Sequence, residues 1–280
     1  GHSLGFPHNM KASSSYTVEQ LRDPEFTAKY GTEASIMDYG RFNYVAQPGD
    51  GARLIPLVGP YDFFAVEWGY KQYDSAEAEK AGQKALVAKQ VGDLTLRFGN
   101  PNAGEDPSQQ TEDLGSDPIL ATTLGLKNID RVAGYLVQAT CDEDEDYDLL
   151  SNMYDELLAQ RNRELGHVAS VVGGFVQANL WYGDSDKRFH PVSAAKQREA
   201  VEFLNEHAFE TPRSLIQDDI LRRLEASGAP ERILGGQRRL LSSLMRQDRI
   251  DRMAEHADRA RGDAYLPVDL LRDLTAGIWS

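Results

Sequence analysis

The chain has 280 residues, of which 41% are hydrophobic, and this is enough apolar material for one large core or two moderate ones. Its 44 acidic side chains outnumber its 30 basic ones, for a net charge of −14, so nucleic acid and anionic membrane surfaces are poor partners. The single cysteine, Cys141, excludes internal disulfides, and no apolar run approaches the roughly 18 residues needed to cross a bilayer.

The first element carries histidines at a metal-ligand spacing. His2, Gly5 and His8 fit the second half of the zinc signature H-E-x-x-H-x-x-G-x-x-H. In the complete signature, two histidines four apart lie on one face of a helix with a glutamate between them, and the glycine turns the chain so that a third histidine closes the site. By themselves, two histidines are more typical of ordinary surface or capping residues at a chain end, and this alternative stays open.

A methionine follows His8 by 29 positions, in the segment Ser35-Ile36-Met37-Asp38-Tyr39. Methionine is soft and unbranched, and it can form a pliable apolar floor beneath histidine ligands. The phenol of Tyr39, two residues later, is chemically suited to stabilise a developing oxyanion. By itself Met37 is typical of a core residue, so its meaning depends on the histidines before it.

Residues 59–70, GPYDFFAVEWGY, predict a loop that enters an aromatic helix. Asp62 is placed to cap this helix and Gly69 to end it. We expect the helix to pack beneath the segment 35–39 that contains Met37.

These residues in this order resemble the metzincin clan of zinc metallopeptidases, whose Met-turn lies beneath the zinc. With NMKASSSY at 9–16, GHV at 166–168 and GIW at 277–279, the chain looks like a large bacterial family of zinc-dependent, metzincin-like proteins long catalogued as domains of unknown function. The resemblance covers most of the chain, but only about the first forty residues carry specific chemistry. It implies these roles: His2 and His8 as zinc ligands, Gly5 and Met37 as structural support of the site, and Tyr39 as the transition-state stabiliser.

The resemblance implies a zinc-dependent endopeptidase that hydrolyses peptide bonds with a metal-activated water, acts on a peptide or protein substrate, and is periplasmic or secreted. The signature also requires a histidine and a general-base glutamate at positions before Gly1. We therefore expect this chain by itself to hold zinc weakly or not at all and to be inactive. Two alternatives stay open: a helical interaction or scaffold module with vestigial peptidase features, and a zinc amidohydrolase that is not a peptidase.

The middle of the chain predicts helices and one loop. Residues 74–90 predict a solvated helix, and the Gly, Pro, Asn and acidic composition of 98–116 predicts a loop or lid. A helix is expected from Asp117-Pro118 through Leu136. The acidic run 142–146 predicts the charged start of another helix, because the glycine and the terminal glutamate of a calcium-binding EF-hand are missing.

The remaining residues predict a short β-hairpin among helices. Glu164 and His167 form one E-x-x-H pair, and a carboxylate-bridged metal centre needs two. The hairpin is expected over 175–190, and helical periodicity marks four segments: 194–209, 212–226, 230–261 and 267–277. Arginines at 238, 239, 246, 249, 252 and 259 alternate with acids, which favours an ion-paired solvated face.

The expected architecture is mainly α. The lower, C-terminal subdomain of a metzincin unit with its Met-turn is expected over 1–73, a linker of one solvated helix and a loop over 74–115, and a multi-helix domain containing the hairpin over 116–280. The oligomeric state, the substrate and the regulation are not indicated by the sequence.

Overall fold

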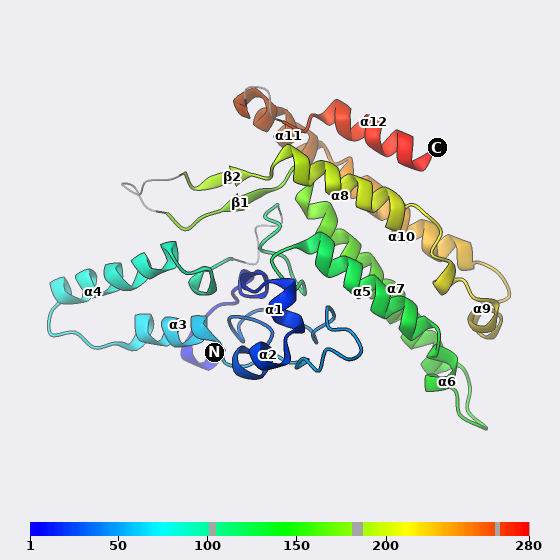
Figure 1. Ribbon diagram of the computed structural model, residues 1–280, viewed down its shortest axis with the longest axis horizontal. Helices are drawn as coiled ribbons and strands as arrows, with labels where there is room; N and C mark the ends of the chain where they lie inside the picture. The colour runs from blue at the N-terminus through cyan, green and yellow to red at the C-terminus, as the bar shows by residue number, and fades with distance from the viewer. Residues whose placement is uncertain (101–104, 181–186, 261–263, 280) are drawn as a thin grey trace. The chain divides into compact units, whose positions relative to one another are not determined.

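The computed structural model describes residues 1–100, 105–180, 187–260 and 264–279, and these residues form a mainly α-helical protein with a small two-stranded antiparallel sheet (Figure 1). The predicted mainly α fold is confirmed. The chain divides into two compact units, Gly1–Ala121 with Phe175–His190, and Thr122–Gly174 with Pro191–Ser280. The three-part division by composition stays a prediction. None of the helices described is both long and apolar enough to cross a bilayer.

The first unit is built from short helices joined by long irregular segments. Thr17 and Gln20 form a capping box that starts α1, and the Asp23 carboxylate accepts the first free N–H groups of α2. A segment without regular structure, 31–59, then contains residues 35–39, for which the sequence predicts a Met-turn. The helices of this unit are η1 (His2–Leu4), η2 (Ser13–Ser15), α1 (Val18–Arg22), α2 (Pro24–Tyr30), α3 (Pro60–Tyr70), α4 (Ala76–Ala88), η3 (Lys89–Val91) and η4 (Leu94–Leu96).

The two helices predicted after residue 58 are present as α3 and α4. Asp62 caps α3 from inside its first turn, where its carboxylate accepts the Gly59 N–H at 2.7 Å. The predicted end at Gly69 is wrong, because the helix continues to Tyr70 and closes with a bond from the Lys71 N–H to Glu67 O. The α4 helix is solvated as predicted, and Leu86 is its buried residue.

A buried ion pair joins three distant segments of the first unit. Lys11 Nζ lies 2.9 Å from Asp106 Oδ2, and both side chains are almost completely shielded from solvent. The same ammonium donates to Gln177 O at 2.6 Å, and Asp106 Oδ2 accepts the Gln177 N–H at 2.9 Å. The pair therefore fixes the N-terminal segment and the loop around residue 106 to strand β1 (Phe175–Gln177). Burial lowers the pKa of Lys11, although the Asp106 carboxylate opposes this shift.

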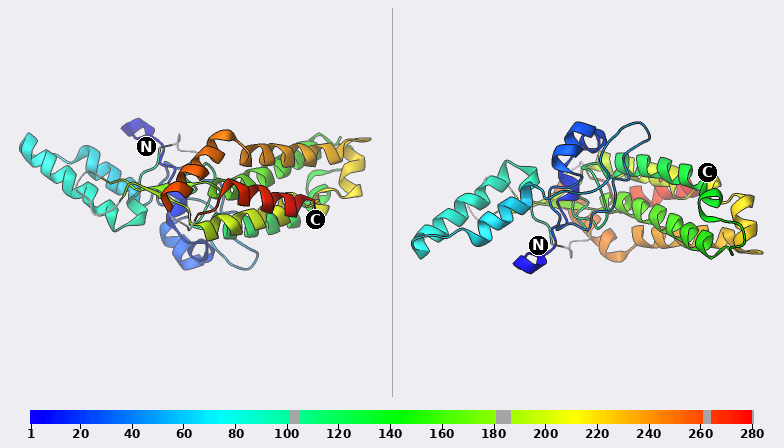
Figure 2. Two further views of the ribbon diagram at one scale, coloured as in Figure 1. Left: turned by 90° about the horizontal axis from the view of Figure 1, so that it is seen from above. Right: turned by 90° about the horizontal axis from the view of Figure 1, so that it is seen from below.

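The second unit is a bundle of longer helices. α7 packs against α8 and α10, and α12 packs against α8, as Figure 2 shows. Tyr154 and Leu150 of α7 are completely buried in its core, where the Tyr154 hydroxyl donates to Leu215 O at 2.6 Å. The elements are α5 (Pro118–Ala133), α6 (Leu136–Thr140), α7 (Asp148–Val171), α8 (Ala194–His207), η5 (Arg213–Leu215), α9 (Asp218–Leu224), α10 (Ala229–Leu244), α11 (Gln247–Ala260) and α12 (Pro267–Ile278).

Three helices predicted as continuous are interrupted. The helix expected through Leu136 stops at Ala133 and restarts as α6, with the break at Gly134, where glycine favours irregular backbone. The segment 212–226 is divided into η5 and α9, and 230–261 is divided into α10 and α11 at Met245. Hydrophobic periodicity does not detect such breaks, because the apolar residues on both sides keep facing the same core.

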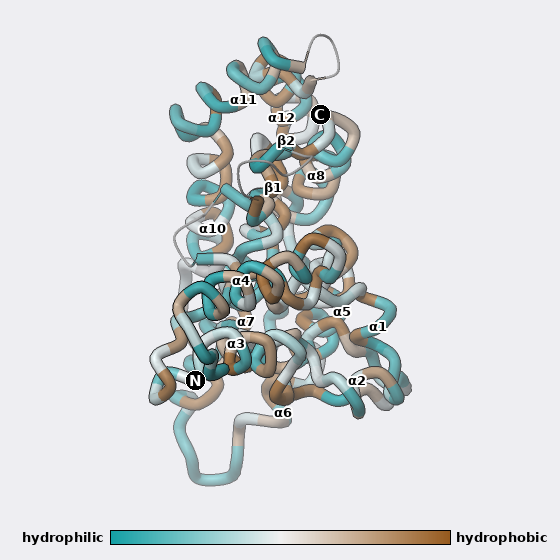
Figure 3. The backbone as a smooth tube through the Cα atoms, turned by 90° about the vertical axis from the view of Figure 1, so that its left-hand side faces the viewer, coloured by the Kyte–Doolittle hydropathy of each residue, from teal (hydrophilic) through white to brown (hydrophobic). Residues whose placement is uncertain are grey.

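The arginine-rich stretch is partly an ion-paired surface and partly a helix cap. Arg246 pairs with Asp248, and Arg259 pairs with Glu255, as predicted. The predicted solvated face is wrong for Arg249 and Arg252, which donate to backbone carbonyls at and just after the end of α7, those of Ala169, Val172 and Gly173. Their positive charges suit the negative end of the helix dipole. Figure 3 shows hydrophilic and hydrophobic residues alternating along α11.

The predicted hairpin is confirmed in its strands. β1 pairs with β2 (Phe189–Pro191), and the Ala178 N–H donates to Arg188 O at 2.8 Å. The expected turn at 183–186 lies outside the described residues.

Candidate functional site

The structure brings His2 and His8 together. Their Nε2 atoms lie 3.2 Å apart, and the rings meet edge to face with centroids 4.6 Å apart. Gly5 makes this possible: it ends η1 in the left-handed conformation (φ 79°), and its N–H bonds to His2 O, so the chain reverses between the histidines.

Each ring is oriented by a backbone carbonyl on its other nitrogen. His2 Nδ1 lies 2.9 Å from Phe6 O, and His8 Nδ1 lies 3.0 Å from Met37 O. A carbonyl oxygen can only accept a hydrogen bond, so both Nδ1 atoms carry a proton. In the neutral form of each ring, this tautomer leaves the Nε2 lone pair free to accept a proton or bind a metal ion. Two lone pairs that face each other are stabilised when a cation lies between them.

This arrangement fits zinc. Two imidazole nitrogens at about 2.0–2.1 Å from a tetrahedral zinc ion would be about 3.3 Å apart, close to the observed 3.2 Å. The carbonyl behind each Nδ1–H is the usual outer partner of a metal-bound histidine. Among the described residues, no group of three or more His, Cys, Asp or Glu side chains is arranged to hold a metal ion, so these two histidines form a pair and not a full ligand set.

Met37 lies directly against the start of the chain. Its side chain is buried, and a Cβ added to Gly1 would overlap with the Met37 sulfur. Its carbonyl accepts both His8 Nδ1–H and the Asn9 N–H, the latter at 2.9 Å. Met37 therefore supports the histidine segment through its side chain and its backbone.

α3 holds the Met37 segment in place, as the sequence led us to expect. The Asp62 carboxylate accepts the Ser35 hydroxyl at 2.6 Å and the Ile36 N–H at 3.0 Å. The Ser35 Oγ in turn accepts the Met37 N–H at 3.0 Å. A hydrogen-bonded path thus runs from Asp62 through Ser35 to Met37 and on to His8.

Tyr39 lies on the other side of His8. The two rings are stacked, with centroids 3.9 Å apart and planes inclined by 26°. About half of the Tyr39 side chain is exposed, and so are the apolar side chains of Leu4 and Ile36 in the two segments that meet here. The phenol is therefore accessible to a molecule that binds beside the histidines.

Buried acids lie in the same part of the unit, and the sequence does not predict them. Asp38 accepts the Ser13 N–H at 2.8 Å, and the Ser13 hydroxyl donates to Asp113 at 3.0 Å. Burial raises the pKa of Asp38 to about 6 and, together with the Asp38 charge, that of Asp113 to about 8. No local pattern marks these residues, because Asp113 lies 75 positions after Asp38 in an irregular segment.

The E-x-x-H pair lies in the interior of the second unit. Glu164 and His167 are both buried on α7, and Gln160 donates to Glu164 Oε1 at 2.7 Å. The Glu164 carboxyl occupies space that a Cβ on Gly125 would fill. Burial raises its pKa to about 8, so Glu164 is mostly neutral at pH 7. The pair does not belong to a metal-holding group among the described residues.

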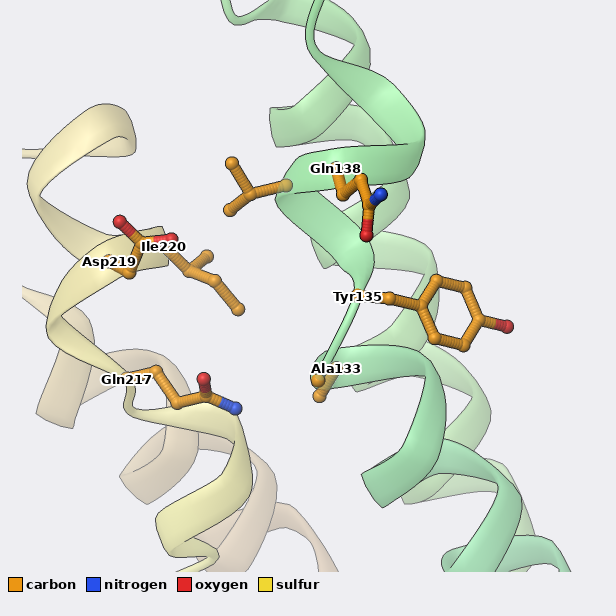
Figure 4. A pocket seen from close by; sticks show the side chains of 8 residues that line it. Ala133, Tyr135, Gln138, Gln217, Asp219 and Ile220 are labelled. Carbon is orange, nitrogen blue, oxygen red and sulfur yellow. The ribbon is translucent and has the colours of Figure 1, made fainter.

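A pocket in the second unit lies between the α5–α6 break and α9 (Figure 4). Its volume is about 230 Å³, below the several hundred Å³ typical of ligand sites. The lining holds one carboxylate, Asp219, which pairs with Arg223. It carries no convergent reactive groups, so the histidine pair is the stronger candidate site. The lining residues are Ala133, Gly134, Tyr135, Val137, Gln138, Gln217, Asp219 and Ile220.

Comparison with known proteins gives one match. A family model described as Met-zincin matches residues 1–280, the whole chain. No curated protein and no solved structure gives a significant match.

Proposed function

Because the chain belongs to the Met-zincin family, we propose that it forms part of the active site of a zinc-dependent endopeptidase. The observation that carries this proposal is the convergence of two Nε2 atoms 3.2 Å apart, with each ring held by a backbone carbonyl on its Nδ1. In the proposed assignment His2 and His8 hold the metal, and Gly5 and Met37 shape the site.

When bound, zinc supplies a Lewis acid that polarises the scissile carbonyl and lowers the pKa of water. The residues of this chain orient the two histidine rings and stabilise the transition state. The carbonyls of Phe6 and Met37 keep the imidazole protons on Nδ1, and so keep Nε2 of His2 and His8 available for the metal. The Tyr39 phenol donates its proton in a hydrogen bond to the oxyanion that develops on the substrate carbonyl.

The signature that includes His2, Gly5 and His8 also needs a histidine and a glutamate earlier in the motif. We propose that the working enzyme contains both residues as part of the complete signature, and that the glutamate is the general base. Because the described residues supply two histidines and no third ligand for the metal, we propose that this pair without the rest of the signature binds zinc weakly and does not hydrolyse peptides.

The substrate is proposed to be a peptide in extended form. The exposed apolar side chains of Leu4, Ile36 and Tyr39 beside the histidines offer a surface for its side chains. A periplasmic or secreted location is proposed from the family resemblance. The zinc amidohydrolase and the scaffold module remain the rival functions.

The experiment compares two proteins, the 280-residue chain and a version extended upstream through the complete signature. Zinc content is measured by mass spectrometry, and hydrolysis is measured on casein and on a panel of small amides. We expect about one zinc and casein cleavage only in the extended protein. Cleavage of the amides alone favours the amidohydrolase, and an extended protein without zinc favours the scaffold.

Variants of the extended protein test the ligand assignment. We expect His8→Ala to lose zinc, whereas the matched control His190→Ala, in strand β2, retains it. Tyr39→Phe is expected to keep zinc and to lower kcat by about 100-fold, the usual cost of removing one oxyanion donor. Equal zinc content in the His8 and His190 variants contradicts the assignment.

A further inference from the structure

One carboxyl group of the first unit, that of Glu33, is buried away from solvent and makes no hydrogen bond within the described residues. Glu33 is fully buried, with 0% of its surface exposed, and neither carboxyl oxygen has a hydrogen-bond partner among the described residues. Burying an ionised carboxylate without a partner costs far more than burying the neutral acid. The geometry therefore favours the protonated form of Glu33.

The ionisable groups near Glu33 increase this preference. They are Asp38 of the same segment, Asp62 of α3, Asp113 before α5, and the phenol of Tyr16, whose hydroxyl is also buried without a hydrogen-bond partner. None of them carries positive charge. Burial, with the negative charges of the three aspartates, raises the pKa of Glu33 to about 9.

The place of Glu33 in the chain connects it to the Met37 segment. Glu33 and Gly40 flank residues 34–39, which contain Met37 and Tyr39. The two flanking residues approach so closely that a Cβ on Gly40 would overlap with the Glu33 carboxyl. The side chain of Glu33 thus crosses from one end of this segment to the other.

We propose that Glu33 is a positioning residue which, as a neutral carboxylic acid packed against Gly40, holds the two ends of the 34–39 segment together and releases them when it ionises. On ionisation the proton passes to solvent, and the new charge is repelled by Asp38, Asp62 and Asp113. Because Met37 O accepts His8 Nδ1–H, release of the segment also changes how His8 is held. The consequence of this change for zinc binding rests on the proposed function. The opening of the segment itself does not require zinc.

The test measures amide hydrogen exchange of residues 34–40 in the metal-free 280-residue chain from pH 6 to pH 9. After correction for the intrinsic pH dependence of exchange, each pH unit is expected to increase the opening constant of this segment about tenfold through Glu33. Glu33→Gln keeps the shape of the side chain and cannot ionise. We expect it to remove that tenfold dependence per pH unit.

The matched control is Glu164→Gln, which removes another buried acid, in the second unit. It is expected to leave the exchange of residues 34–40 unchanged. Gly40→Ala, which fills the space used by the Glu33 carboxyl, is expected to increase exchange at every pH. An identical pH dependence in the wild type and in Glu33→Gln overturns the proposal.

A direct titration keeps the proposal testable if Glu33→Gln does not fold. The carboxyl carbon of Glu33 in the wild-type chain is followed by NMR, and a midpoint above pH 7 supports the neutral acid. A midpoint near the ordinary value of about 4.3 overturns it. Because both measurements are made without zinc, failure of the peptidase proposal leaves their outcome unaffected.

Discussion

Replacing Asp106 by Asn tests whether the buried Lys11–Asp106 pair stabilises the first unit. The carboxylate accepts the Lys11 ammonium and the N–H groups of Ser108 and Gln177, all at 2.9 Å. Asparagine keeps the shape but removes the charge, and this leaves the Lys11 ammonium buried without a counter-ion. Breaking a buried pair in this way costs about 3–5 kcal/mol. For a chain of this size we expect the unfolding transition of the first unit to fall by about 10 °C.

The pH dependence separates the charge from the lost hydrogen bonds. Burial already lowers the pKa of Lys11, and removing Asp106 removes the group that opposes this shift. The unfolded state then binds more protons than the folded state at alkaline pH, so the stability of the variant rises relative to the wild type as pH increases.

Differential scanning calorimetry of the wild type, Asp106→Asn and the exposed control Asp74→Asn measures both effects. We expect the gap in stability between the wild type and Asp106→Asn to be widest near neutral pH and to narrow as the pH rises through the lowered pKa of Lys11 in the variant. A loss below about 1 kcal/mol, equal to that of the control, refutes the reasoning, because an uncompensated buried ammonium cannot cost so little.

Three further predictions concern single side chains. The pKa of Glu164 is raised to about 8, so the contribution of this side chain to stability is full below its unfolded pKa and is lost as the pH rises through about 8. We therefore expect Glu164→Gln to be as stable as the wild type near pH 4. At pH 9 we expect the variant to be more stable, by at most about 5 kcal/mol in denaturant titrations. Tyr154→Phe leaves Leu215 O without its donor, and we expect a loss of about 1–3 kcal/mol in the same assay. Between pH 4 and pH 9, below the ordinary pKa of about 10 for tyrosine, this loss is expected not to vary with pH. Gly5→Ala places a side chain on a backbone in the left-handed region, at a position with open space around it. We expect the folded state to lose about 1 kcal/mol of stability. We also expect the extended protein to bind zinc more weakly, as measured by competition with a chelator. An unchanged zinc affinity would show that the reversal at Gly5 does not set the distance between the histidines.

The helices and their approximate ends were largely predictable from the sequence. Capping residues and proline mark the starts of α3, α5 and α12, and periodic apolar residues mark α7 and α8, because these signals act within a few residues. The breaks at Gly134 and Met245 were missed, since the same faces of the interrupted helices continue to be buried.

The sequence by itself determined the elements of the candidate site, namely the spacing of His2, Gly5 and His8 and the position of Met37. A short motif can be predicted from neighbouring residues alone, because a single turn at the glycine brings its two histidines together. Only the tertiary structure decided the surroundings: the Asp62–Ser35 contact, the Lys11–Asp106 pair and the buried Glu33. Each of these residues is an ordinary polar side chain in the sequence, and it acquires its role from burial and from partners that lie far away along the chain.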